Sequence, residues 1–244
     1  MDPITGRSVK KPTSPWVWVG CGCGLAVVLA LALFAGLTYF GYREAKKLEK
    51  TLTDPTAREA KVKEVISYDE LPAGYYPMMG FSIPFLLDMA MFTDQEPVAG
   101  AIAGSDNFKD HGFFFMDMRE IRDNREEMRR TLRGEKTKGD SPITQSNVNF
   151  DVHEVIRRGT VEVNGTEVLY SAGRGELKQE KDSREGIVAM LMPECPGSNR
   201  VRFGLWFSTD PAPQKPLAEA DFTGTPADPE ALKEFLGHFR LCGE

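Results

Sequence analysis

The chain has 244 residues and a formal net charge of −6 at pH 7. From Asp54 to the C-terminus it carries 23 Lys and Arg residues against 33 Asp and Glu residues, so this part has a net charge of −10. Such a surface repels nucleic acid and anionic lipid, which argues against a nucleic-acid partner. The apolar fraction of 41% and the charged fraction of 27% are ordinary for a globular protein.

An uncharged apolar stretch near the N-terminus predicts a single transmembrane helix. No charged residue occurs between Lys11 and Arg43, and about 20 apolar residues are enough to span a bilayer. Aromatic residues stand at both ends of the stretch, where the two headgroup layers would lie. A cleaved signal peptide is the competing interpretation, but the apolar run is too long for one. We therefore expect a cytoplasmic tail at residues 1–15 and a transmembrane helix at residues 16–42. A stalk at residues 43–53 would lead to one soluble domain at residues 54–244.

The orientation of the predicted helix does not follow from the charges, because basic residues flank both of its ends. We expect the soluble domain outside the cytoplasm at the cell membrane, because short basic N-terminal tails commonly stay inside. Gly20 and Gly24 form a small-xxx-small pair that would let two such helices approach closely as a homodimer. The alternative is that both glycines simply face lipid.

The first half of the soluble domain begins with a helix and continues with strands. Asp54 is placed to cap a helix and Pro55 suits its first turn, so a helix is expected from there until before Pro72. Alternating apolar residues then predict strands at residues 79–85, 98–103 and 112–118. Asp123 with Glu126 has the spacing of a capping box and predicts a surface helix that runs to about residue 133.

The second half reads as strands closed by a helix. Residues 148–152 alternate as a strand with one wet face, and Asn164-Gly165 between two β-rich runs predicts a type I′ hairpin. Two further antiparallel strands are expected at residues 187–192 and 201–207. A final helix opens at Asp228-Pro229 and places several apolar side chains on one side.

This order predicts an α+β domain, in which an antiparallel or possibly mixed sheet packs against helices and is closed by a C-terminal helix. The element order, with the final helix Asp228-Pro229-Glu230-Ala231-Leu232-Lys233-Glu234-Phe235-Leu236, resembles the PsbP-like family of extracytoplasmic proteins. The resemblance implies an α/β/α sandwich around an antiparallel sheet. It covers the order of elements over the soluble part, and it implies no functional residues because no family motif is matched.

The soluble domain contains two cysteines, Cys195 at a strand end and Cys242 after the final helix. We hypothesise that they form a disulfide that holds the C-terminal helix to the sheet. A disulfide persists in oxidising compartments, so this hypothesis also places the domain outside the cytosol. The alternative is two unpaired buried thiols. Cys21 and Cys23 lie within the predicted membrane segment and lack the spacing of a redox pair.

No signature of an enzyme is found in the sequence, and we expect no cofactor. A metal or hydrolytic site is conceivable if the strands that carry Asp110, His111, Asp151 and His153 are neighbours. The simpler interpretation is that Asp151 and His153 lie on the wet side of a half-buried strand.

Methionine supplies a second signal, because the spacing MxM occurs in three predicted strands. Both sulfur atoms of each pair would point to one side of a strand, and thioethers are soft ligands that select Cu(I). Methionine also fills irregular space in a core, which is the simpler interpretation. The pairs are Met89 with Met91, Met116 with Met118, and Met190 with Met192.

These observations predict a membrane-anchored, extracytoplasmic binding or assembly module that is not an enzyme. Its partner would be a protein or a small molecule of unknown identity. The alternative is a protein that handles Cu(I) through the MxM methionines, or a hydrolase that uses an Asp and His strand face.

Overall fold

The computed structural model describes residues 53–97, 108–119, 124–135, 149–178 and 183–243. All of them belong to the second of the two compact units into which the chain divides, Leu48–Glu244. At residues 124, 149–151, 177–178 and 183–184 only the course of the backbone is described.

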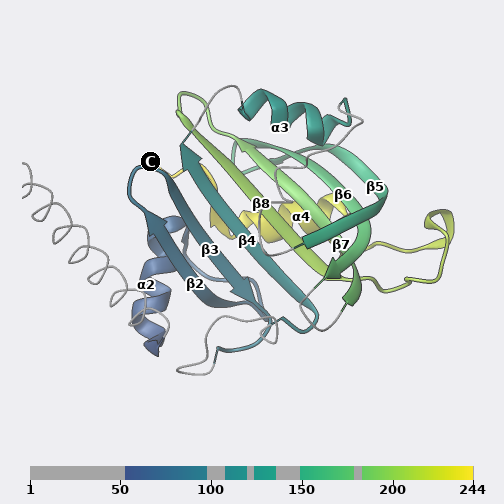
Figure 1. Ribbon diagram of the computed structural model, residues 1–244, viewed down its shortest axis with the longest axis horizontal. Coiled ribbons are helices and arrows are strands. Elements are labelled where there is room, and N and C mark those ends of the chain that lie inside the picture. Colours follow the sequence, from purple (N-terminus) through teal and green to yellow (C-terminus); the bar gives the residue numbers. More distant parts are fainter. Residues whose placement is uncertain (1–52, 98–107, 120–123, 136–148, 179–182, 244) are drawn as a thin grey trace, which may run out of the picture. The chain divides into compact units, whose positions relative to one another are not determined.

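Seven strands of the described residues form one antiparallel sheet (Figure 1), in the order β2-β3-β4-β8-β7-β6-β5. The strands are β2 (Tyr76–Ile83), β3 (Leu87–Thr93), β4 (His111–Arg119), β5 (Asn149–Val163), β6 (Thr166–Lys178), β7 (Ser183–Glu194) and β8 (Arg200–Thr209). A second, two-stranded sheet pairs β1 (Ser67–Tyr68) with β9 (Phe239–Arg240) and so ties the C-terminal end of the chain to the segment after the first helix.

Three α-helices accompany the sheet in the described part of the chain: α2 (Pro55–Val65), α3 (Asn124–Arg133) and α4 (Pro229–Gly237). The predicted caps are confirmed for two of them. Asp54 accepts hydrogen bonds from the backbone N–H groups of Thr56 and Ala57, and Asp228 accepts one from Glu230. A short 3₁₀ turn, η3 (Leu217–Glu219), interrupts the long connection from β8 to α4.

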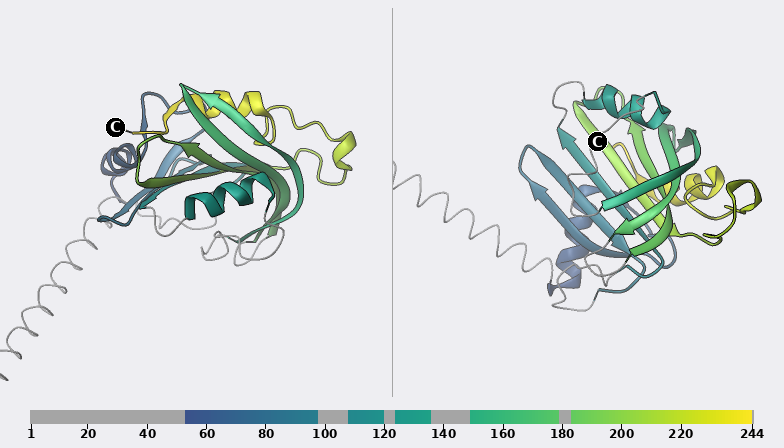
Figure 2. Two further views of the ribbon diagram at one scale, coloured as in Figure 1. Left: turned by 90° about the horizontal axis from the view of Figure 1, so that it is seen from above. Right: turned by 45° about the vertical axis from the view of Figure 1, so that its right-hand side comes forward.

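The sheet carries an apolar core on each of its two faces. On the first face α2 and α4 pack on the sheet in the larger core, which contains Phe92, Phe113 and Phe115. At Gly80 the backbone of α2 comes so close that an added Cβ atom would lie 2.8 Å from Lys61 C, so only glycine fits there. On the second face α3 packs in a smaller core. Figure 2 shows α3 and α4 on opposite sides of the strands.

The predicted fold class, an α+β domain, is wrong, because the fold is mostly antiparallel sheet. The described part of the chain is dominated by one antiparallel sheet, every strand pair in it is antiparallel, and its helices are only 9 to 11 residues long. The sequence indicated short strands because Gly173, Gly175 and charged residues interrupt the apolar pattern of β6. Backbone hydrogen bonding to the neighbouring strands carries β6 through these residues over 13 positions.

The predicted transmembrane helix at residues 16–42, the tail before it and nearly all of the stalk lie outside the described residues. So does the predicted strand at residues 98–103. Within the part of the chain that the structure describes, no helix is long and apolar enough to cross a membrane.

Candidate functional site

The second face of the sheet is apolar over β2, β3 and β4. Directly opposed residues of neighbouring strands point to the same side, and the register aligns Phe81 with Met89 and then Met116. A parallel row aligns Met91 with Phe114. We call this surface the Met-rich face and define it by nine side chains: Met79, Phe81, Ile83, Leu87, Met89, Met91, Phe114, Met116 and Met118.

None of the nine side chains of the Met-rich face is fully buried and none is charged. Eight are half-buried and Ile83 is exposed. The residues that alternate with them, such as Ala90, Phe92 and Phe115, are buried in the larger core on the other side. Strands that are apolar on both sides are typical of sheets covered on both sides. A contiguous apolar surface that stays partly accessible is a candidate site of interaction.

Helix α3 covers only the neighbouring part of the second face. Its Met128 and Leu132 pack with side chains of β6, β7 and β8, among them Met192, which is 1% exposed. Met116 and Met118 lie at the margin of this core and contact it. In Figure 1, no described helix lies over the same side of β2, β3 and β4. The Met-rich face therefore begins where the cover provided by α3 ends.

The structure places all three MxM pairs on this second face. Met190 lies opposite Leu205 of β8, which lies opposite Phe114 of β4, so the β7 pair points to the same side as the pairs of β3 and β4. Met89 and Met116 are direct cross-strand partners. Met192 is enclosed under α3, whereas the four methionines of β3 and β4 are half-buried. The MxM residues thus divide between a closed core and an accessible face.

The Asp and His residues considered for a hydrolytic site are not brought together. Asp110 and His111 are at the start of β4, while Asp151 and His153 are on β5, and three strands of the sheet separate β4 from β5. A register shift between Val152 and Glu154 also interrupts the regular alternation that would put Asp151 and His153 on one side. Within the described residues, no group of three or more His, Cys, Asp or Glu residues has the arrangement of a metal site.

His111 instead belongs to an aromatic cluster at the edge of the larger core. Its ring lies 4.5 Å from the ring of Tyr75, and its Nε2 is 3.3 Å from the carbonyl oxygen of Gly74. Tyr75 Oη accepts a hydrogen bond of 2.6 Å from Trp206 Nε1. Burial raises the pKa of Tyr75 well above its ordinary value, although the bond from Trp206 opposes this shift. The tyrosine is therefore a neutral structural group at physiological pH.

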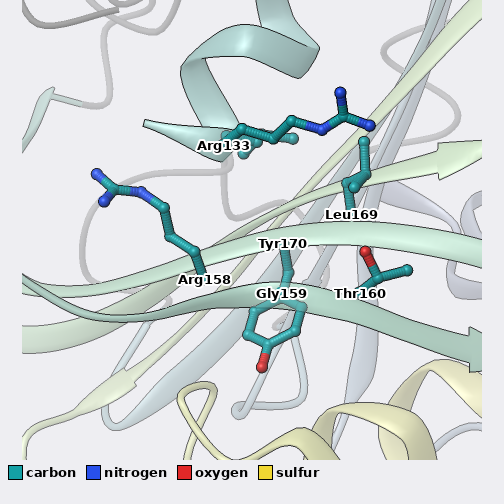
Figure 3. A pocket seen from close by; sticks show the side chains of 7 residues that line it. Arg133, Arg158, Gly159, Thr160, Leu169 and Tyr170 are labelled. Carbon is teal, nitrogen blue, oxygen red and sulfur yellow. The ribbon is translucent and has the colours of Figure 1, made fainter. Parts of the chain in front are cut away.

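The larger of the two best-defined cavities among the described residues has a volume of about 230 Å³ and lies between the end of α3 and strands β5 and β6. Arg133 and Arg158 extend from opposite sides of it, with their guanidinium groups pointing apart (Figure 3). Leu132 and Leu169 contribute apolar surface and Thr160 one hydroxyl group. Because the two cations diverge, the cavity lacks the convergent polar groups that hold a small ligand.

The predicted disulfide is confirmed. Cys195 and Cys242 are joined with a Cα–Cα distance of 5.5 Å, which links the end of β7 to the segment after β9. The bond therefore ties the last strand and the end of α4 to the sheet. Cys195 is 4% exposed and Cys242 is half-buried, so the bond lies between the core and the protein surface.

Sequence reasoning did not find the Met-rich face as a surface, although a signal for it was present. Residues 85–92 and 113–118 are apolar except for Asp88 and Asp117. Such nearly continuous runs indicate strands that are apolar on both sides. Both aspartates lie on the opposite side, where they pair with Arg200.

Comparisons of this chain with protein-family models, with curated proteins and with solved structures found no match. The resemblance to the PsbP-like family therefore stays a prediction from the order of elements.

Proposed function

We propose that this protein is a non-enzymatic binding module that acts outside the cytosol, and that its Met-rich face binds an apolar helix of a partner protein. The observation that carries the proposal is the half-buried, uncharged surface over β2, β3 and β4. The disulfide between Cys195 and Cys242 supports an oxidising compartment. Attachment to a membrane through residues 16–42 stays a prediction from the sequence.

The dimensions of the Met-rich face support a helix as its occupant. Three adjacent strands are about 10 Å across from the first to the third, close to the diameter of a helix with its side chains. On the other side of these strands, one helix of 11 residues, α2, packs against β2 and β3. A helix on the Met-rich face would lie beside α3 and would extend the helical layer that α3 begins.

The composition of the face supports a helix with a largely apolar side. Met side chains are unbranched and polarizable, so they adapt to the shape of a partner, and methionine is common at surfaces that bind amphipathic helices. Five of the nine residues of the Met-rich face are methionine. Because none of the nine is charged, affinity would come from buried apolar area.

A model peptide tests this proposal without knowledge of the natural partner. The probe is a fluorescent 18-residue amphipathic helix of Leu and Lys, measured by fluorescence anisotropy with the full-length protein in 0.3 M salt, which screens the acidic surface. A peptide of the same composition in scrambled order controls for charge. We expect micromolar binding of the amphipathic peptide, and a Met116→Glu substitution should weaken it at least tenfold. Val155→Glu places the same charge at an exposed apolar residue of β5 and should leave binding unchanged.

Three outcomes would contradict the proposal. Equal binding of the peptide by the wild type and Met116→Glu would exclude the Met-rich face as the binding surface. Absence of peptide binding to the wild-type protein would show that the Met-rich face does not take a helix from outside the chain. Binding of phosphatidylcholine vesicles through Met116, in place of the peptide, would show that the occupant is lipid.

One observation favours Cu(I) handling as a second candidate function. Met89 and Met116 are direct cross-strand partners, and Met91 and Met118 lie two residues away on the same strands and the same face. Competition with a chromophoric Cu(I) chelator in the presence of ascorbate measures the affinity. A Met89→Leu and Met116→Leu double variant keeps the apolar volume and removes both thioethers, so it should lose copper but keep the helical peptide. Equal copper affinity in both proteins would exclude this site.

A further inference from the structure

We propose that the turn between β2 and β3 inserts into the boundary between headgroups and acyl chains of a lipid bilayer. This inference goes beyond the proposed function, because it concerns another partner and three residues outside the Met-rich face, Pro84, Phe85 and Leu86. Ile83 alone belongs to both surfaces. The turn presents three large apolar side chains to water: Phe85 is 87% exposed, Leu86 46% and Ile83 38%. Pro84 between them is exposed as well. We call Ile83, Pro84, Phe85 and Leu86 the apolar tip.

The backbone of the apolar tip holds Phe85 in an unfavourable conformation. The amide of Leu86 donates to the carbonyl of Ile83 at 3.0 Å, which makes Ile83 to Leu86 a β-turn with Pro84 second and Phe85 third. Phe85 has φ +65°, at a turn position that normally takes glycine or asparagine. A bulky side chain there is strained, and Phe85 recovers almost nothing by packing within the chain. Strain of this kind concentrates at functional sites.

The base of the hairpin fixes the direction in which the apolar tip points. The carbonyl of Leu86 accepts a hydrogen bond of 3.0 Å from the amide of Arg119. Arg200 bridges two strands, since its Nη2 lies 2.5 Å from Asp88 and its Nε lies 2.5 Å from Asp117. Arg202 adds a bond of 2.9 Å to the second oxygen of Asp117. The tip is therefore held on a rigid strand pair, so that little conformational entropy would be lost on insertion.

The charges around the apolar tip favour lipid as its partner. The base of the hairpin carries three arginines, Arg119, Arg200 and Arg202, and two aspartates, Asp88 and Asp117. Arg200 pairs with both aspartates and Arg202 pairs with Asp117, while Arg119 is exposed. Among these described side chains the arginines exceed the aspartates by one positive charge, in a domain of net charge −10. They stand next to the apolar side chains, where a phosphate group would lie beside an inserted tip. An aromatic ring with two aliphatic chains above a cationic base has the chemistry of an interfacial anchor.

The acidic remainder of the domain decides which lipid suits the tip. Because a net charge of −10 repels an anionic surface, insertion should be driven by the apolar side chains and should occur with zwitterionic lipid. Phosphatidylcholine vesicles are therefore the appropriate probe.

A fluorescent label at the tip tests the inference in the full-length protein. Cys21 and Cys23 are changed to Ser, Phe85 is changed to Cys, and the new thiol is labelled with NBD without reductant, which leaves the disulfide closed. The protein is reconstituted into phosphatidylcholine vesicles with and without lipids brominated near the top of the acyl chain. The matched control places the label at Glu219, which is exposed in η3 at the opposite end of the sheet.

We expect the label at position 85 to emit at shorter wavelength and to be quenched at least twofold by brominated lipid, while the label at position 219 is not. Ile83→Asp with Leu86→Asp in the labelled background should abolish the quenching, whereas Met116→Glu should leave it unchanged. A label at position 85 that stays as hydrated as the label at position 219 would overturn the inference. An emission shift that grows with protein density but is insensitive to bromine would also overturn it, because the tip would then contact a second copy.

Discussion

The disulfide between Cys195 and Cys242 offers a prediction whose magnitude follows from the topology. The bond joins residues 47 positions apart, so it restricts the unfolded chain to a loop of that length. The loop-closure relation then gives a stabilisation of about 4 kcal/mol. For a domain of this size, such a loss corresponds to a fall of roughly 8–16 °C in the thermal midpoint. In urea the midpoint should fall by roughly 2 M.

The assay is urea unfolding of the full-length protein, followed by far-UV circular dichroism, with the bond intact, reduced, or removed by Cys195→Ala and Cys242→Ala. The reduced wild type keeps both sulfur atoms in place and isolates the loss of the cross-link. The double variant also removes packing around the buried Cys195, so it should be slightly less stable than the reduced protein. An unfolding midpoint that does not respond to reduction would refute the reasoning. Equal alkylation of native and reduced protein at these two thiols would refute the bond itself.

Three further predictions concern the electrostatics and the strain of the hairpin region. Asp117→Asn should lower the free energy of unfolding, measured in urea, by about 3 kcal/mol, because the nearly buried Arg202 loses its counter-ion. Asp88→Asn removes a more exposed ion pair and should lower the free energy of unfolding by less than about 1 kcal/mol. Burial raises the pKa of Asp94, but hydrogen bonds from the amides of residues 109–111 and the charge of His111 outweigh it, so the pKa is lowered. Ionised Asp94 should contribute its full stability above its ordinary pKa of 3.8, and this stability should be lost as the pH falls through the lowered pKa. The urea midpoints of the wild type and of Asp94→Asn should therefore differ at pH 7 and converge in acid. Phe85→Gly should raise the free energy of unfolding by roughly 0.5–1 kcal/mol, because glycine adopts the positive φ without strain. Phe85→Ala should bring no gain, because alanine keeps a Cβ atom at the same φ. A destabilised glycine variant would show that Phe85 is not strained.

Local chemistry made several features of this protein predictable from residue order alone. Asp54 and Asp228 identify helix starts because a carboxylate can accept from the first free amides of a helix, and both caps are observed. Asn164-Gly165 identifies a hairpin because both residues tolerate positive φ, and both adopt it. The disulfide could be anticipated because the domain contains only two thiols.

The fold class and the candidate site required the tertiary structure, because both depend on which strands become neighbours. Period-two alternation shows that Met89 and Met91 share a side of their strand, but it does not show that Met116 lies opposite Met89, since register is set by pairing between distant segments. Alternation also could not show that three strands lie between β4 and β5, which separates His111 from His153. The sequence by itself determines where single elements begin and which side of each is apolar. Only the packing of the sheet decides which of those apolar sides is enclosed and which, like the Met-rich face, remains accessible to a partner.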